Sequence, residues 1–176
     1  MELWDLYDEN RVPLGRTHPR GEPVPEGTYH LAVIVVILNP RGEVLLTRRA
    51  KEKAVCPGWW ENTGGAALAG ETSLQAILRE LLEETGLAPD PQELTLLLRE
   101  DRRTDAHFDI YALTWEGEPE DIRFQPGRRT RPVDAPGGVG GRGGHRGTLC
   151  PARKEEYKQE LYRRIALYLQ GQREFS

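Results

Sequence analysis

The sequence predicts a mixed α/β fold, and three observations carry this prediction. Residues 31–38 form a continuous apolar run rich in β-branched side chains, which is typical of a strand buried on both faces. Residues 73–85 and 152–170 each repeat apolar side chains at the period of an amphipathic helix. Several strands combined with two helices in a chain of 176 residues indicate one α/β domain.

The predicted sheet is built on a central hairpin. The apolar run at 31–38 is the first strand of this hairpin and the central strand of the sheet. Residues 39–42 (Asn-Pro-Arg-Gly) have turn chemistry, so residues 43–49 are expected to return as the second arm. Further strand candidates are residues 3–7, 94–99 and 108–115.

The helix at 73–85 is the best-specified element. Thr72 and Gln75 have the spacing of a capping box, and Gly86 stands where a left-handed residue would end the helix. The stripe predicted to be buried consists of Leu74, Ile77, Leu78, Leu81 and Leu82. In the C-terminal helix the apolar positions are Tyr157, Leu161, Ile165 and Tyr168 or Leu169.

Three carboxylates, Glu80, Glu83 and Glu84, are left on the face of the first helix that is directed away from the core. An isolated E-x-x-E-E pattern is more often a solvated helix face than a site. Here, however, like charges crowd together and the only cation on the helix is Arg79. Mg²⁺ prefers carboxylate oxygens and keeps positions for water and phosphate, so the cluster suits this ion. The nearby Gly64-Gly65 pair lets the backbone come close and makes a carbonyl oxygen a candidate ligand.

The segment from Gly65 to Leu87 resembles the Nudix box, G-x5-E-x7-R-E-U-x-E-E-x-G-U, where U is aliphatic. The fixed positions all match, and they are Gly65, Glu71, Arg79, Glu80, Leu81, Glu83, Glu84, Gly86 and Leu87. At average residue frequencies a chance match has a probability on the order of 10⁻⁶. The similarity reaches from about residue 1 to 125 and resumes in the last helix. It implies a Nudix α/β/α sandwich with a mixed β-sheet and the Nudix loop-helix.

The same resemblance implies an activity and a site. The activity is cleavage of the pyrophosphate bond of a nucleoside diphosphate linked to another moiety, with Mg²⁺ or Mn²⁺ as cofactor. The implied metal ligands are Glu80, Glu83, Glu84 and the carbonyl of Gly65. Arg79 and Glu71 are implied to pair and to orient these ligands, which typically matters nearly as much as ligation.

The base that takes the proton of the attacking water is left open between a box glutamate and an acid of a later loop. The candidates outside the box are Glu100, Asp101, Asp105, Asp109, Glu116 and Glu118. Each of them is more often an ordinary surface or turn residue.

A second resemblance covers the N-terminal half of the chain. Residues 5–10, Tyr29-His30, 45–49 and 57–63 are similar to the arm and early sheet of isopentenyl-diphosphate isomerase and its Nudix relatives. That enzyme requires a cysteine and a histidine-rich metal site. At the matching positions this chain has Gly65 and Ala67, which argues against isomerisation. A catalytically inactive Nudix-like binding module is a third alternative, and the intact box counts against it.

The remaining residues of chemical interest are expected to have structural roles. His18 and His30 lack the third histidine of an isomerase-like metal site, and Cys56 suits a buried small side chain. Trp59 and Trp60 are expected to pack in the core or an interface rather than to stack on a nucleobase. His107 and His145 have no supporting pattern.

Composition and charge exclude several classes of function. A net charge of −4 argues against a broad basic face that grips nucleic acid, whereas a small diphosphate remains suitable if a cation mediates. The longest apolar run has eight residues, and roughly 20 are needed to cross a bilayer. Two cysteines are too few for a disulfide framework, and no secretory signal begins the chain, so a cytoplasmic location is expected.

The domain is expected to span residues 1–176, with an N-terminal arm at 1–29 that either covers the site or contacts a second copy in a homodimer. One segment, 128–150, departs from this pattern: it has seven Gly and five Arg but a single acid, and no apolar periodicity. It is a flexible loop, an anion-binding loop or, as we hypothesise from its abrupt limits, a stretch translated out of frame. Reading the gene in its other frames tests the last idea.

Overall fold

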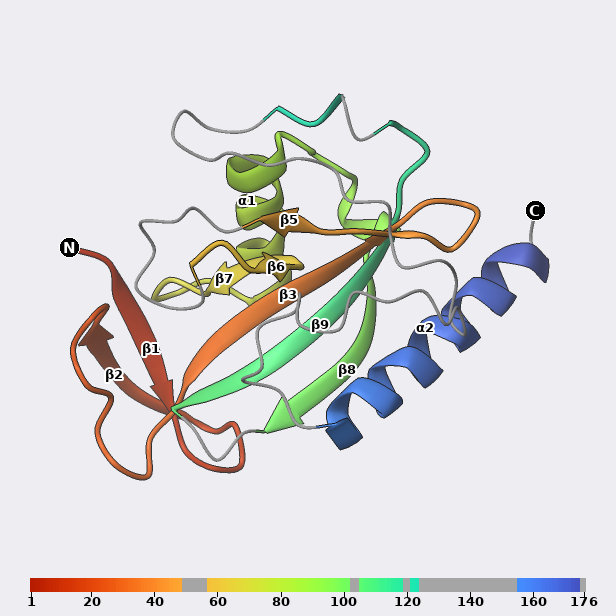
Figure 1. Ribbon diagram of the computed structural model, residues 1–176. Coiled ribbons are helices and arrows are strands. Elements are labelled where there is room, and N and C mark those ends of the chain that lie inside the picture. The colour runs from red at the N-terminus through yellow and green to blue at the C-terminus, as the bar shows by residue number, and fades with distance from the viewer. Residues whose placement is uncertain (49–56, 102–104, 119–120, 124–154, 175–176) are drawn as a thin grey trace.

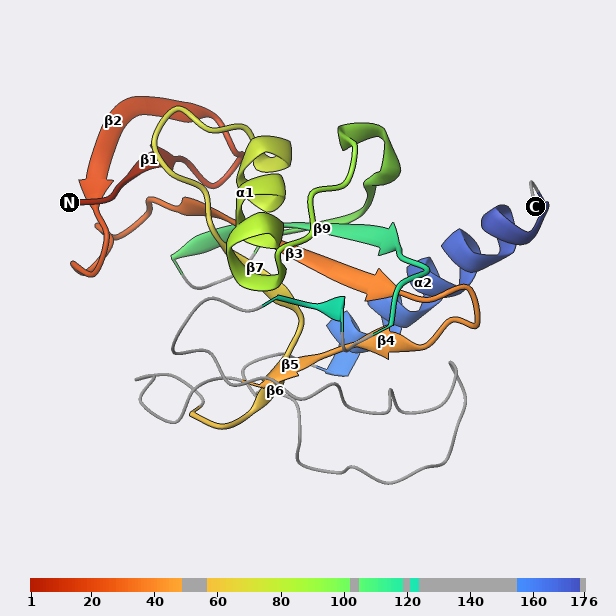
Figure 2. The same cartoon turned by 90° about the horizontal axis from the view of Figure 1, so that it is seen from above.

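The computed structural model describes residues 1–48, 57–101, 105–118, 121–123 and 155–174. In this part of the chain a mixed sheet lies between two helices, α1 (Ser73–Thr85) and α2 (Glu155–Glu174), which pack on its opposite faces (Figure 1, Figure 2). The predicted α/β/α sandwich is therefore confirmed. Segment 128–150 and both cysteines lie outside the described residues.

Strand β3 (His30–Leu38) is the centre of the sheet, as predicted. One of its edges pairs in parallel with β9 (Ala106–Thr114), and β9 pairs antiparallel with β8 (Thr95–Asp101). The other edge of β3 pairs antiparallel with β7 (Thr63–Ala66) and then with the short β4 (Val44–Leu45).

Alternate side chains of β3 enter two separate cores. Val33, Val35 and Ile37 pack under α1, whereas Ile34, Val36 and Leu38 pack under α2. Each of these six residues is at most 6% exposed. Burying such a side chain contributes roughly 1.5–3 kcal/mol, so both faces of the strand stabilise the sandwich. This two-sided burial explains why the apolar run is continuous rather than alternating.

The second arm of the predicted hairpin is divided in the structure. Only β4 pairs with β3; the chain then leaves to form β5 (Thr47–Arg48), which pairs with β6 (Trp60–Glu61). A single strand over 43–49 was therefore wrong. The short or exposed elements β2 (Pro13–Pro19), β6, β7 and the 3-10 helix η1 (Pro91–Glu93) have too little apolar pattern to be predicted.

The N-terminal arm is a β-hairpin of β1 (Leu3–Tyr7) and β2, packed on its own chain. Tyr7 and Tyr29 exchange backbone hydrogen bonds of 2.8 and 2.9 Å, and Leu6 is 2% exposed. In the turn, Arg11 adopts a φ of 63° and donates to the buried carboxylate of Asp109 at 2.7 Å. The arm is thus attached to the sheet at the end of its first strand and in the turn that follows.

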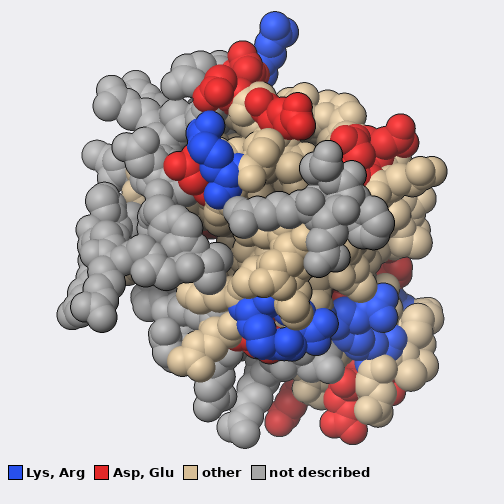
Figure 3. Space-filling model, turned by 90° about the vertical axis from the view of Figure 1, so that its right-hand side faces the viewer, with Lys and Arg blue, Asp and Glu red and all other residues tan. Residues whose placement is uncertain are grey.

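The side of the molecule on which α2 lies carries a band of Lys and Arg side chains with acidic ones around it (Figure 3). On α2 itself, Arg163 and Arg164 both donate to Glu160, at 2.8 and 2.7 Å. Exposed pairs of this kind contribute little to stability, so they mark a solvated helix face. No helix in the described residues combines the length and apolar character of a membrane span.

Candidate functional site

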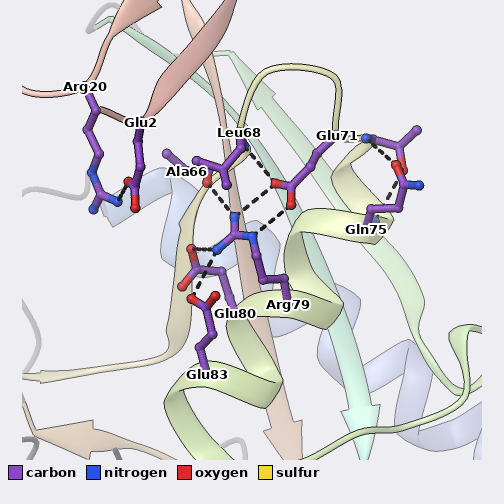
Figure 4. A network of polar contacts seen from close by, with 10 residues as sticks. Glu2, Arg20, Ala66, Leu68, Glu71, Gln75, Arg79, Glu80 and Glu83 are labelled. Carbon is purple, nitrogen blue, oxygen red and sulfur yellow. Dashed lines mark hydrogen bonds and ion pairs between the residues drawn. The ribbon is translucent and has the colours of Figure 1, made fainter.

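Acidic residues of α1 and of the loop before it surround one guanidinium group, that of Arg79 (Figure 4). Its Nε and Nη2 donate to the two carboxylate oxygens of Glu71 at 2.8 and 3.0 Å. Its Nη1 donates to Glu80 at 2.9 Å and to Glu83 at 3.3 Å. Nη2 also donates to the carbonyl oxygen of Ala66 at 3.0 Å. Arginine has five N–H donors, and each finds an acceptor here, so one side chain joins three carboxylates.

The contact between Arg79 and Glu71 keeps both groups charged. The hydrogen bonds from Arg79 lower the pKa of Glu71 below its ordinary value of 4.5, although partial burial acts in the opposite direction. A further hydrogen bond from the backbone N–H of Leu68, at 2.8 Å, also lowers the pKa of Glu71. The hydrogen bonds to Glu71 in turn raise the pKa of Arg79.

The structure corrects the predicted orientation of α1. Glu80 and Glu84 do not face away from the core: they are 7% and 6% exposed, while Leu82, expected to be buried, is 56% exposed. Only Glu83 faces outward as predicted, with 47% of its side chain exposed. Part of the reason lies in β7, where Gly65 leaves the space that the carboxylate of Glu80 occupies and the backbone N–H of Gly64 points to Glu84.

Each glycine of β7 makes room for a different neighbour. A Cβ atom on Gly65 would lie 2.2 Å from Oε1 and 2.4 Å from Cδ of Glu80. A Cβ atom on Gly64 would lie 2.2 Å from the carbonyl oxygen of Val33 on the adjacent strand. The backbone N–H of Gly64 also points to Glu84, with N and Oε2 separated by 3.4 Å. Gly65 therefore accommodates a carboxylate, and Gly64 accommodates the adjacent strand.

The ends of α1 hold these acids in place. Thr72 and Gln75 form the predicted capping box, and Gly86 ends the helix in the left-handed conformation with a φ of 73°. Ser73, in the first turn, and Tyr111 of β9 share a hydrogen bond of 2.6 Å between their hydroxyl groups. The caps fix the two ends of α1, and this contact with the sheet restrains its rotation about the axis.

The donor chemistry of this cluster fits a divalent cation such as Mg²⁺ or Mn²⁺. Carboxylate and carbonyl oxygens are the ligands that hard cations prefer, and the carboxylate of Glu80 lies directly against the backbone of Gly65. Among the described residues, no three acidic, histidine or cysteine side chains are already close enough to hold a metal ion. Arg79 lies between Glu80 and Glu83, so a cation that uses both carboxylates competes with the guanidinium for them.

Among the described side chains, the acids predicted outside the box form no metal-binding group with it. Asp109 is 3% exposed and paired with Arg11, so it anchors the N-terminal arm. Asp105 is exposed, and its carbonyl accepts the N–H of His30 at 2.9 Å. Glu116 and Glu118 are exposed beyond the end of β9, and Glu100 lies on β8. The side chain of Asp101 is outside the described residues.

The described histidines do not come together as metal ligands. The ring of His30 stacks on Trp4 with centroids 4.1 Å apart, and burial lowers its pKa. His107 is 1% exposed, and its Nε2 lies 2.8 Å from the carbonyl oxygen of Asp8. His18 is on β2, with Nε2 3.2 Å from the carbonyl oxygen of Glu22. Trp59 and Trp60 are partly buried.

Sequence reasoning missed the part that the N-terminal arm plays around the box. Glu2 and Arg20 form an ion pair of 2.5 Å beside Arg79 (Figure 4). Asp5 accepts the backbone N–H of Gly70 at 2.7 Å. No periodicity or spacing signals a contact between residues 65 positions apart.

The sequence of this chain is similar to those of known proteins. The family model described as NUDIX domain matches residues 28–132. An uncharacterized Nudix hydrolase of Listeria monocytogenes is 46% identical over 91 residues, which cover 51% of this chain and 54% of that protein. An isopentenyl-diphosphate Delta-isomerase of Corynebacterium glutamicum is 38% identical over 91 residues, which cover 51% of this chain and 48% of that protein. The chain thus spans about half the length of the curated relatives it matches.

Solved structures share the fold. A protein from Deinococcus radiodurans superimposes with a TM-score of 0.64 and 22% identity, covering 75% of this chain and 82% of that one. The MutT protein from Methanosarcina mazei has a TM-score of 0.56 and 18% identity, covering 85% of this chain and 98% of that one. At these identities the likeness shows the architecture alone.

Proposed function

Because the chain belongs to the Nudix family, whose domain covers residues 28–132, we propose that it is a hydrolase of pyrophosphate bonds that requires Mg²⁺ or Mn²⁺. Its proposed substrate is a nucleoside diphosphate linked to another moiety. The observation that supports this most strongly is the set of carboxylates that Arg79 gathers beside the glycine pair of β7.

The proposed metal ligands are Glu80, Glu83, Glu84 and the carbonyl of Gly65. When bound, the cation neutralises charge on the diphosphate and activates the attacking water. Arg79 holds Glu80 and Glu83 through a single nitrogen, which restricts both carboxylates. Glu71 accepts two hydrogen bonds from Arg79 and so fixes the plane of the guanidinium.

The charges of the site support the proposed requirement for a cation. The box contains four carboxylates and one guanidinium, and a diphosphate adds further negative charge. Anions repel one another strongly at the short separations of a partly buried site. We therefore expect substrate affinity, as well as turnover, to depend on the metal ion.

Isomerisation of isopentenyl diphosphate is the second candidate, because several relatives of the N-terminal half carry that name. The residues at the positions of the isomerase thiol and histidine are Gly65 and Ala67. The described histidines also form no cluster with other metal-binding side chains. These features favour hydrolysis over protonation of an alkene.

A panel of diphosphates, each incubated with Mg²⁺ and with a chelator, tests the proposal. It contains sugar nucleotides, dinucleotides, other nucleoside diphosphate derivatives and isopentenyl diphosphate. We expect Mg²⁺-dependent release of a phosphomonoester from a nucleotide substrate and no change in isopentenyl diphosphate. Rearrangement of isopentenyl diphosphate without release of phosphate would support the isomerase instead. No turnover of any member would support an inactive binding module.

Three related expectations are also proposals. The partner is a small-molecule diphosphate rather than nucleic acid, given the net charge of −4. The site of action is the cytoplasm, given the scarcity of cysteine. A homodimer is the proposed assembly, and light scattering on the purified protein measures its mass directly.

A further inference from the structure

The loop that precedes α1 is held by contacts from the N-terminal hairpin. Residues 68–71 form a turn whose tip, Ala69 and Gly70, is exposed, and Gly70 has a φ of 85°. The carbonyl oxygen of Leu3 accepts the N–H of Ala69 at 2.8 Å. The carboxylate of Asp5 accepts the N–H of Gly70 at 2.7 Å. Both acceptors belong to β1, two residues apart along the strand.

The other two amides of this turn are satisfied within the turn itself. The N–H of Glu71 donates to the carbonyl of Leu68 at 3.0 Å, and the N–H of Leu68 donates to the carboxylate of Glu71 at 2.8 Å. Four consecutive backbone amides therefore have defined acceptors. An exposed loop that contains glycine is otherwise free to adopt many conformations, so these bonds decide where Glu71 stands.

The position of Glu71 matters because of what it contacts next. It accepts two hydrogen bonds from Arg79, and Arg79 donates to Glu80 and Glu83. A continuous series of hydrogen bonds thus runs from Asp5 on the arm to the proposed metal ligands. Its successive members are Asp5, the turn at 68–71, Arg79 and the carboxylates of α1.

The arm is rigid enough to act as a support. Leu6, next to Asp5, is 2% exposed, and Tyr7 is bridged to Tyr29 at the start of the sheet. The turn of the hairpin is held by Arg11, which donates to Asp109 at 2.7 Å and to the carbonyl of Phe108 at 3.0 Å. The acceptor on Asp5 is therefore fixed relative to β3 and β9.

We propose that Asp5 is a positioning residue for the active site, acting through the turn at 68–71 on the pair of Glu71 and Arg79. This inference rests on the proposed function for its catalytic consequence, but its structural part is independent of the reaction. The bond to Gly70 is charge-assisted and exposed, so its loss lets water replace the acceptor at little cost in stability. What is lost is the fixed position of Glu71.

The test compares Asp5→Ala with Asp5→Asn, which keeps an acceptor oxygen, and with Glu9→Ala, an exposed acid in the turn of the same hairpin. Steady-state kinetics on the substrate found in the panel should show kcat lowered about 10-fold in Asp5→Ala, the lower end of the effect of groups that orient metal ligands. KM should stay near its wild-type value. Asp5→Asn should recover most of the kcat, and Glu9→Ala should match the wild type.

A nuclear magnetic resonance measurement gives a readout besides activity. The Nε proton of Arg79 donates to Glu71 and should exchange slowly with water in the wild type. In Asp5→Ala its exchange should become markedly faster, while Asp5→Asn should resemble the wild type. If Asp5→Ala does not fold, Asp5→Leu, of similar size but without an acceptor, takes its place.

Unchanged exchange of the Arg79 proton in a folded variant that lacks the acceptor would overturn the inference. Equal loss of kcat in Asp5→Ala and Asp5→Asn would overturn it as well. If no diphosphate is hydrolysed by the wild type, the proposed function fails, and the exchange measurement still decides the role of Asp5.

Discussion

The carboxylate of Glu80 occupies the space that a side chain on Gly65 would fill. A Cβ atom on Gly65 would lie 2.2 Å from Oε1 of Glu80, and Nη1 of Arg79 donates to that same oxygen at 2.9 Å. A glycine of β7 and an arginine of α1 thus determine together where this buried acid stands.

Gly65→Ala should reduce turnover more than stability. The added methyl group meets the end of a flexible side chain, so Glu80 must move while the backbone remains in place. We expect kcat to fall about 10²-fold, as for the loss of one well-placed electrostatic group. Steady-state kinetics and thermal unfolding of the same preparation measure the two effects.

Gly64→Ala is the matched control, because its methyl group meets the carbonyl oxygen of Val33 and the Cα atom of Ile34 instead. Those atoms belong to the central strand and cannot turn aside. This variant should therefore be the less stable of the two, by about 1–3 kcal/mol relative to wild type. A Gly65→Ala protein that keeps wild-type kcat would contradict the assignment of Glu80.

Glu83→Gln should abolish most of the activity and leave the fold intact. The side chain of Glu83 is 47% exposed, so its replacement removes a charge without opening a cavity. We expect kcat to fall about 10²–10³-fold with little change in melting temperature. Glu26→Gln, at an exposed position of the arm, should be neutral in both assays. Full Mg²⁺-dependent activity in Glu83→Gln would remove this residue from the site.

Arg79→Lys should weaken catalysis although the positive charge is retained. A lysine ammonium cannot reproduce the fork that reaches Glu71, Glu80 and Glu83 together. We expect kcat to fall about 10–100-fold, the usual effect of losing a group that orients metal ligands. Arg163→Lys, on the exposed side of α2, provides the control. Equal kcat values in the two variants would show that the fork has no catalytic role.

The pair of Glu71 and Arg79 should make stability depend on acid pH. Arg79 lowers the pKa of Glu71 in the folded state. The pair therefore stabilises the protein fully at pH values above 4.5, which is the ordinary pKa of this carboxyl. This contribution is lost as the pH falls through the lowered folded-state pKa. The difference in unfolding free energy between wild type and Glu71→Gln should thus be constant near neutral pH and shrink in acid. Urea unfolding at a series of pH values measures it, and a difference that does not shrink would contradict the ion pair.

Arg11→Ala should destabilise the protein by leaving the buried Asp109 with a weaker partner. The side chain of Asp109 is 5% exposed, and its other cation, Arg99, is 3.7 Å away. We expect a loss of about 1–3 kcal/mol in urea unfolding. Adding Asp109→Asn to Arg11→Ala should cost less than the sum of the two single losses, because the pair is removed only once. Strict additivity would show that the two residues do not interact.

Local sequence pattern predicted α1 well but not its rotation. The limits of the helix, its capping box and Gly86 all follow from residues within one turn of each end, and the structure confirms them. Counting apolar positions, however, assigned Leu82 to the core and Glu80 to solvent. What the helix buries depends on the opposing strand, and Gly65 of β7 creates a place for the carboxylate of Glu80 that a hydrophobicity pattern does not register.

Contacts over long sequence separations could not be predicted. The bond from Gly70 to Asp5 and the pair of Arg11 and Asp109 join positions 65 and 98 residues apart. The division of the predicted strand at 43–49 has a similar origin, since β5 leaves β3 to pair with β6. The pair of Glu71 and Arg79 was anticipated only through the resemblance to the Nudix box.

Phosphorus nuclear magnetic resonance in water enriched in ¹⁸O tests the central claim most directly. Wild-type protein with Mg²⁺ and a nucleoside diphosphate derivative should convert the pyrophosphate signal into two phosphomonoester signals, one of them shifted by a single ¹⁸O atom from the solvent. Glu83→Gln under the same conditions should leave the pyrophosphate intact. An unchanged pyrophosphate signal with the wild type across the whole panel, or equal conversion by the variant, would contradict hydrolysis at these carboxylates.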